Sequence, residues 1–282
     1  MKFRRFSKAF TMVELLAVIA IIALMAVLVG PTLKNFSRGD RTASATRQLL
    51  DAVARARQLA ITQRTTVYMV FVPTNFWNNP VFFINNPVLT GADWLAATNM
   101  ADRQLTSYNF VSLHSMGDQP GRNNPRYLSA WQSLPDGTFV AFDKFTTDRN
   151  TYLANLYTLS GFKVYGFDVT TNIPFPLAET LPYPNMPPYP RLPYIAFNYL
   201  GQLTTEPLAP RPSQHDEFIP LAHGAVSITR DGNKVPVLVP FPAVPPSMIA
   251  SETPAGNSTN NYNLVHIDWL TGRARLEHRE VK

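Results

Sequence analysis

The chain has 282 residues, of which 45% are hydrophobic, so it can bury a core and is not mainly disordered. Its 25 prolines, 13 glycines and 12% aromatic residues indicate a strand-rich body with proline-containing loops, and the absence of cysteine excludes disulfides, thiolate metal sites and cysteine nucleophiles. The net charge of +6 does not indicate a polyanion partner, because four of the 25 basic residues lie within the first nine positions, which leaves 21 against 19 acidic residues.

An apolar segment follows this basic start. It runs from Met12 to Leu33 and has Glu14 as its only charged residue. A helix of this length covers about 33 Å, close to the roughly 30 Å of hydrocarbon in a bilayer, so we predict a transmembrane helix over residues 10–33. A cleaved secretory signal is the nearest alternative, but the apolar core of such a signal is only about 7 to 15 residues long.

The carboxylate of Glu14 is costly inside an apolar span, which suggests that it has a specific role. If the mature chain began at Phe10, its amine and the unpaired N–H groups of the first helical turn would favour a negative charge one turn later. The same carboxylate could pair with the amine of a neighbouring copy, which would make it an assembly signal.

The string KAFTMVELL, from Lys8 to Leu16, resembles the type III signal of type IV prepilins and type II secretion pseudoprepilins. That signal has a short basic leader, a small residue and then Phe-Thr-Leu-Val/Ile-Glu-Leu. The resemblance implies a leader over residues 1–9, cleavage between Ala9 and Phe10, N-methylation of Phe10, and contact between Glu14 and the amine of the adjacent subunit. This family usually has Gly where the chain has Ala9.

The resemblance also implies partners and a location. The partners would be the prepilin peptidase/methyltransferase, other pilin or pseudopilin subunits and inner-membrane lipid. The protein would be a single-pass protein of the bacterial inner membrane with its C-terminal head outside the cytoplasm, later incorporated into a filament or pseudopilus. A generic single-pass anchor is the remote alternative, and it would require only the apolar run.

Gly30 and Pro31 interrupt the apolar run. Proline removes a helix hydrogen bond and clashes with the preceding turn, so we predict a kink there, with a helix end at Leu33 as the alternative. Apolar residues then recur at three- and four-residue steps, which predicts that residues 34–64 form an amphipathic helix continuing into the head. Its polar face is basic and is either solvated or binds lipid headgroups or nucleic acid; the basic residues are Lys34, Arg38, Arg41, Arg47, Arg55, Arg57 and Arg64.

Residues 65–282 read as a β-rich globular head, and the resemblance implies that this head is periplasmic or extracellular. Segments rich in β-branched and aromatic residues predict strands within residues 67–72, 138–142, 162–169, 194–201, 225–229 and 264–269. Residues 73–136 suggest loops or an inserted hairpin around residues 81–84, and residues 174–193 and 236–254 are proline-rich loops. The fold class is therefore α+β, with a long N-terminal helix, membrane-spanning in its first half, packed on an antiparallel β-sheet head with long Pro-rich loops.

Two parts of this head resemble the H-type minor pseudopilins. One is the junction from helix to first strand over residues 54–68, which is rich in small residues. The other is the C-terminal sheet, with an aromatic strand that ends at Gly201 and a final strand that closes with Thr-Gly-Arg at residues 271–273.

No motif predicts catalysis, a metal site or a cofactor. The sequence lacks a phosphate-binding loop, a G-x-S-x-G elbow and an H-E-x-x-H helix. The run His215-Asp216-Glu217 could hold a metal, and His266 could share a strand face with Asp268, but each lacks a third spaced ligand. This lack of catalytic motifs and the resemblance to prepilins together lead us to expect a non-enzymatic, minor structural subunit of a type IV pilus-like or type II secretion pseudopilus filament. The alternative is a minor pilin that binds DNA or a secretion substrate.

Overall fold

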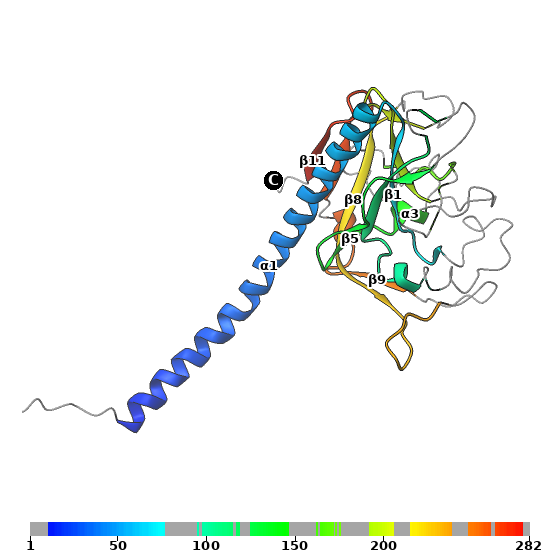
Figure 1. The fold of residues 1–282 in the computed structure, drawn as a ribbon. Helices are drawn as coiled ribbons and strands as arrows, with labels where there is room; N and C mark the ends of the chain where they lie inside the picture. Colours follow the sequence, from blue (N-terminus) through cyan, green and yellow to red (C-terminus); the bar gives the residue numbers. More distant parts are fainter. Residues whose placement is uncertain are drawn as a thin grey trace, which may run out of the picture. The chain divides into compact units, whose positions relative to one another are not determined.

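The structure is a computed structural model, shown in Figure 1. It describes residues 11–76, 95, 98–114, 117–118, 125–146, 162, 164–171, 173, 175, 192–205, 215–238, 248–260 and 263–278, without the side chains of residues 26–40. The predicted leader, the cleavage site, residues 81–84 and most of residues 174–193 lie outside this description. The chain divides into two compact units, Met1–Arg41 and Thr42–Lys282.

Helix α1 runs without interruption from Met12 to Gln63. The helix passes Gly30 and Pro31, so it does not end at Leu33, and the predicted kink stays a prediction. Among the described residues, no helix combines the length and the hydropathy needed to cross a bilayer.

Within the second unit, the last part of α1 packs on antiparallel sheets. Its buried residues follow the three- and four-residue spacing of one helix face, and most are small, which lets the helix axis come close to the strands. They belong to the main core cluster together with side chains from both sheets. These helix residues are Ala45, Leu49, Ala52, Val53, Ala56 and Ala60.

The first sheet has the strand order β3-β2-β1-β6-β7, with β4 also paired to β2. The central strand β1 is buried on both faces: Val67, Met69 and Phe71 contact the cluster beneath α1, whereas Tyr68 and Val70 contact a second cluster. The strands are β1 (Val67–Phe71), β2 (Ser107–Ser112), β3 (Arg126–Tyr127), β4 (Gln132–Ser133), β6 (Tyr194–Phe197) and β7 (Leu203–Thr204).

The second sheet has the order β11-β10-β8-β5, with β9 paired to β8. Backbone hydrogen bonds also link each sheet to a segment that flanks the other, from the Leu203 N–H to the Trp269 carbonyl (3.0 Å) and from the Val140 N–H to the Leu105 carbonyl (2.9 Å). Its strands are β5 (Thr138–Val140), β8 (Glu217–Ile228), β9 (Met248–Glu252), β10 (Asn263–Ile267) and β11 (Ala274–His278). The short helices are α3 (Asp143–Thr146) and α5 (Asn257–Asn260).

Most of the predicted strands are confirmed. Strands β1, β5 and β6 lie within the segments predicted for them, and β10 begins one residue before its segment 264–269, but β8 is longer than residues 225–229. It includes Pro220, which cannot donate to the ladder but accepts a hydrogen bond from the Ala141 N–H (2.9 Å).

Three predictions about the head are wrong. The described residues of the segment 162–169 form no strand, only isolated bridges at Tyr165 and Asp168, of which Asp168 pairs with Tyr194; between them Phe167 stacks on Phe71 (centroids 4.5 Å apart). Strand β9 lies inside the proline-rich segment 236–254, and β2, β3 and β4 lie in the segment 73–136 where loops or one hairpin were expected.

Candidate functional site

The first turn of α1 is closed by its own side chains. Glu14 Oε2 accepts hydrogen bonds from the Thr11 N–H (2.9 Å) and the Thr11 hydroxyl (3.0 Å), and the Thr11 hydroxyl oxygen accepts from the Glu14 N–H (3.2 Å). This reciprocal pair is a capping box, in which the residue before the helix and the third helical residue satisfy each other's N–H groups. Our sequence reading gave Glu14 a role in assembly but missed this one, although the spacing Thr-x-x-Glu before an apolar run is its signal.

The turns that follow present apolar side chains in every direction. Every residue from Thr11 to Met25 is exposed within the structure, and the large apolar side chains among them are between 45% (Val18) and 85% (Met12) exposed. A helix that is apolar all round requires a cover from lipid or from other apolar helices. Ala9 and Phe10 lie outside the described residues, and only the helical backbone is described at Gly30 and Pro31, so Glu14 is the one predicted processing, assembly or kink residue whose contacts are described.

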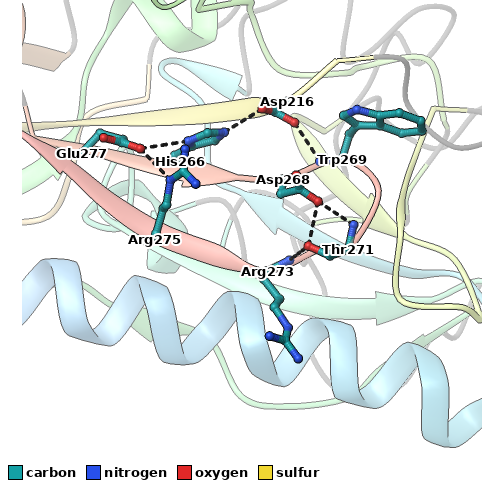
Figure 2. Close-up of polar contacts among 8 residues, drawn as sticks. All are labelled: Asp216, His266, Asp268, Trp269, Thr271, Arg273, Arg275 and Glu277. Carbon is teal, nitrogen blue, oxygen red and sulfur yellow. Dashed lines mark hydrogen bonds and ion pairs between the residues drawn. The ribbon is translucent and has the colours of Figure 1, made fainter.

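A second polar group lies at the β10–β11 hairpin (Figure 2). The ring of His266 is 7% exposed and contacts a carboxylate on each side, Asp216 Oδ2 at Nε2 (2.8 Å) and Glu277 Oε1 at Nδ1 (3.2 Å). The ring stacks on Phe218 with centroids 4.5 Å apart, and Arg275 Nε donates to Glu277 Oε1 (2.6 Å). This group links β8, β10 and β11.

Hydrogen bonds lower the pKa of both carboxyls at this hairpin. Burial raises the pKa of Glu277, but hydrogen bonds from His266 and Arg275 and their charges outweigh it, so the pKa lies below its ordinary value. The side-chain and backbone hydrogen bonds from Thr271, both 2.7 Å, lower the pKa of Asp268. Asp216 also accepts the Trp269 N–H (2.9 Å), so its two oxygens join His266 to the hairpin turn.

The structure rearranges the two candidate metal clusters from the sequence. It brings Asp216 to His266, whereas Asp268 turns to Thr271 and Glu217 forms a buried ion pair with Lys144. Within the described residues, no group of three His, Cys, Asp or Glu side chains could hold a metal. The polar atoms of the His266 group bond to one another, so this group holds the strands together.

Two arginines of the predicted basic helix face contact the head. The guanidinium of Arg55 lies 5.6 Å from the Phe110 ring centroid, and Arg57 Nε donates to the Thr271 carbonyl (2.7 Å). These side chains flank opposite edges of the buried helix face, so Arg55 and Arg57 do not form one continuous basic stripe.

The N-terminal part of the chain matches a known family. Residues 4–30 match the model described as the prokaryotic N-terminal methylation motif. No curated protein and no solved structure matches the chain. The motif belongs to proteins that are typically structural and non-enzymatic, and it implies processing by prepilin peptidase and anchoring in the inner membrane before filament assembly.

Proposed function

We propose that the chain is a minor structural subunit of a type IV pilus-like or type II secretion pseudopilus filament. Prepilin peptidase cleaves it between Ala9 and Phe10, the new amine is methylated, and residues 10–33 hold it in the inner membrane until assembly. The observation that carries this proposal is the coincidence of the motif over residues 4–30 with an apolar, exposed N-terminal segment of α1, residues 12–25, whose sole acid, Glu14, lies in the first turn.

The capping box supports a dual use of Glu14. Oxygen Oε2 receives both hydrogen bonds from Thr11, and no described contact engages Oε1. A carboxylate has about four lone-pair sites, so the second oxygen can accept the amine of Phe10 from a neighbouring subunit while the cap stays closed. In an apolar surrounding such a pair is strong, because neither charge has water as an alternative partner.

Packing between the apolar helices of neighbouring subunits is the second contribution to assembly. In lipid, apolar side chains gain little from leaving acyl chains, so close packing and polar pairs must favour helix association. The Glu14–amine pair provides a polar contact, and the side chains from Leu15 to Val29 provide the packing surface. A bend at Gly30–Pro31 then lets the apolar part follow a bundle while the later part stays on its head.

We assign the chain to the minor subunits because its head resembles the H-type minor pseudopilins in sequence. Support for this assignment lies in the short connection of residues 64–66 from α1 to β1, the small residues of α1 at the sheet, and the antiparallel strands that close the chain. We therefore propose that the head has the arrangement of an H-type minor pseudopilin.

Mass spectrometry and assembly in the native host test the proposal. We expect an intact mass that lacks residues 1–9 and includes one added methyl group, and loss of filament incorporation in Glu14→Leu. Thr11→Ala is the matched control, because it opens the capping box and leaves the carboxylate in place. Incorporation should survive in Thr11→Ala if the amine pair is what matters. Retention of Met1 in the membrane-extracted protein, or normal incorporation of Glu14→Leu, would refute the proposal.

A further inference from the structure

Strand β8 runs past the short strand β5 and on to β9, so part of one of its edges has no neighbouring strand (Figure 1). On that edge β5 pairs with residues 221–223. Among the described residues, the last hydrogen bond on the same side joins the Gly224 N–H to the Gly137 carbonyl (2.9 Å). Residues 225–228 still pair with β9 on their other side. We call this β8 segment, 225–228, the open edge.

The register of β8 shows which backbone groups point outward at the open edge. In an antiparallel ladder, alternate residues direct both their N–H and C=O groups to the same side. The Thr253 N–H donates to the His223 carbonyl (2.9 Å), so the odd-numbered residues face β9, whereas the Gly224 bond turns the even-numbered ones toward β5. Val226 and Ile228 therefore direct their N–H and C=O groups outward, and within the described part of the chain no hydrogen bond reaches them from that side.

A cavity of about 370 Å³ lies at the open edge. It is lined by residues 224–226 of β8 and by the segment that leads into β5. Thr106, Ser133 and Asp136 bring polar side chains to the same lining. A cavity of this kind suits a ligand that forms hydrogen bonds and does not suit a large apolar side chain.

Two other outer edges of the sheets are protected against pairing. Strand β11 carries the charged residues Arg275 and Glu277, and the first sheet ends in β3 and β4, which are only two residues long. Charged side chains and very short strands are features that keep further strands from adding to an edge. The open edge has the sequence AVSI, without a charge or a proline.

The backbone groups of the open edge match a polypeptide. They recur at every second residue, a spacing of about 6.6 Å, and an extended peptide presents its own acceptors and donors at that spacing. Charge adds a second criterion. The carboxylate of Asp136 is exposed and has no ion pair within the described residues, whereas Asp102 is paired with Arg230. A basic side chain on the peptide would meet Asp136.

We propose that the open edge binds an extended, basic segment of another polypeptide, which adds to β8 as a strand and places a lysine or arginine at Asp136. Val226 and Ile228 pack on two of the core clusters, so the edge is held in place before the segment binds, which lowers the entropic cost. The contact goes beyond the proposed filament function and does not depend on it. It needs only one copy of the chain, as in a minor subunit.

Binding of a designed peptide to the full chain in detergent tests the proposal. The probe is a capped hexapeptide of alternating threonine and valine with one terminal lysine, and hydrogen–deuterium exchange with mass spectrometry locates its site. We expect saturable binding at millimolar concentration or below, with slower exchange in residues 224–230. Asp136→Asn should raise the Kd by up to about fivefold, which is the effect of losing one exposed ion pair. Asp51→Asn, at an exposed position of α1, is the control and should leave the Kd unchanged.

Two further variants separate strand addition from attraction between charges. The same peptide with every backbone amide N-methylated keeps its side chains and its charge but cannot donate to β8, so it should not bind. Val226→Pro removes one outward N–H and should weaken binding, whereas Val226→Ala keeps that N–H and should not. Pro220 shows that β8 accommodates proline at an even-numbered position. If Val226→Pro does not fold, the N-methylated peptide decides alone.

Several outcomes would overturn the inference. They are equal binding of the N-methylated peptide, slower exchange only outside residues 224–230, and no binding at millimolar peptide. Slower exchange of residues 224–230 that increases with protein concentration in the absence of peptide would show that a second copy occupies the edge, and it would overturn the inference as well. None of these results bears on filament incorporation, which Glu14→Leu tests separately.

Discussion

The buried ion pair between Lys144 and Glu217 is where a single substitution should cost the most stability. The side chains are 0% and 7% exposed, and Lys144 Nζ also donates to the Tyr165 carbonyl (2.6 Å) and lies 4.7 Å from the Phe167 ring centroid. Each charge therefore has its partner inside the protein and no bulk water to replace it.

We expect Glu217→Leu and Lys144→Met each to destabilise the protein by about 3–5 kcal/mol, because each substitution leaves the remaining charge of the pair unpaired in the core. For a folded unit of this size that corresponds to a fall in Tm of roughly 6–20 °C. The double variant should recover most of the loss, since it removes both charges and leaves apolar groups of similar volume.

Urea denaturation of the full chain in detergent would measure the effect through tryptophan fluorescence, because Trp131 and Trp269 pack against core clusters. Arg230→Met, which breaks the exposed pair with Asp102, is the matched control and should leave the midpoint nearly unchanged. The reasoning is refuted if the single variants lose less than about 1 kcal/mol, or if the double variant loses the sum of both.

Three further predictions concern turns and titrating groups. Gly272→Ala should lower Tm clearly more than Gly232→Ala. Gly272 has φ +63° and a Cβ there would meet the Gly201 carbonyl, whereas a Cβ on Gly232 would meet nothing within 4 Å. Equal decreases in Tm for the two variants would contradict this prediction. The lowered pKa of Glu277 means that its stabilisation is complete above the ordinary value of 4.5 and is lost as the pH falls through the folded pKa, so Glu277→Gln should flatten the acid limb of a stability–pH curve. Burial, with the charge of Asp168, raises the pKa of Tyr194 to about 12, so stability should fall as the pH rises from 10 toward 12, and an ultraviolet titration in which all tyrosines ionise near 10 would disprove it.

The local sequence pattern predicted the helices and strands whose formation depends on neighbouring residues in the chain. The three- and four-residue spacing of apolar residues fixed the buried face of α1, and the run of β-branched and aromatic residues marked β1. The same approach failed for β2, whose sequence SYNFVS reads as polar although all six residues are buried. There Ser107 and Ser133 share a hydroxyl–hydroxyl hydrogen bond and the Ser129 hydroxyl donates to Asn109 Oδ1, so side chains from other parts of the chain give these buried oxygens their partners.

The candidate sites also differ in whether the local sequence could reveal them. The capping box could have been found from the sequence, because Thr11 and Glu14 are three residues apart. The partners of His266 could not, because Asp216 is 50 residues away and Glu277 reaches the ring only through the register of β10 with β11. Alternation along a strand also sends Asp216 and Glu217 to different neighbours, which separates two carboxylates that are adjacent in the chain.

The way α1 joins β1 determines how the head responds to a mechanical load. The helix lies on the sheet over its last turns, and after residues 64–66 the chain returns as the central strand, which is bonded to β2 and β6 and covered on both faces. A pull on the helix from the Thr42 end therefore acts as shear across the whole buried contact, and no hydrogen bond can be unzipped singly from an edge. A head built in this way should stay folded when force is applied to it along α1.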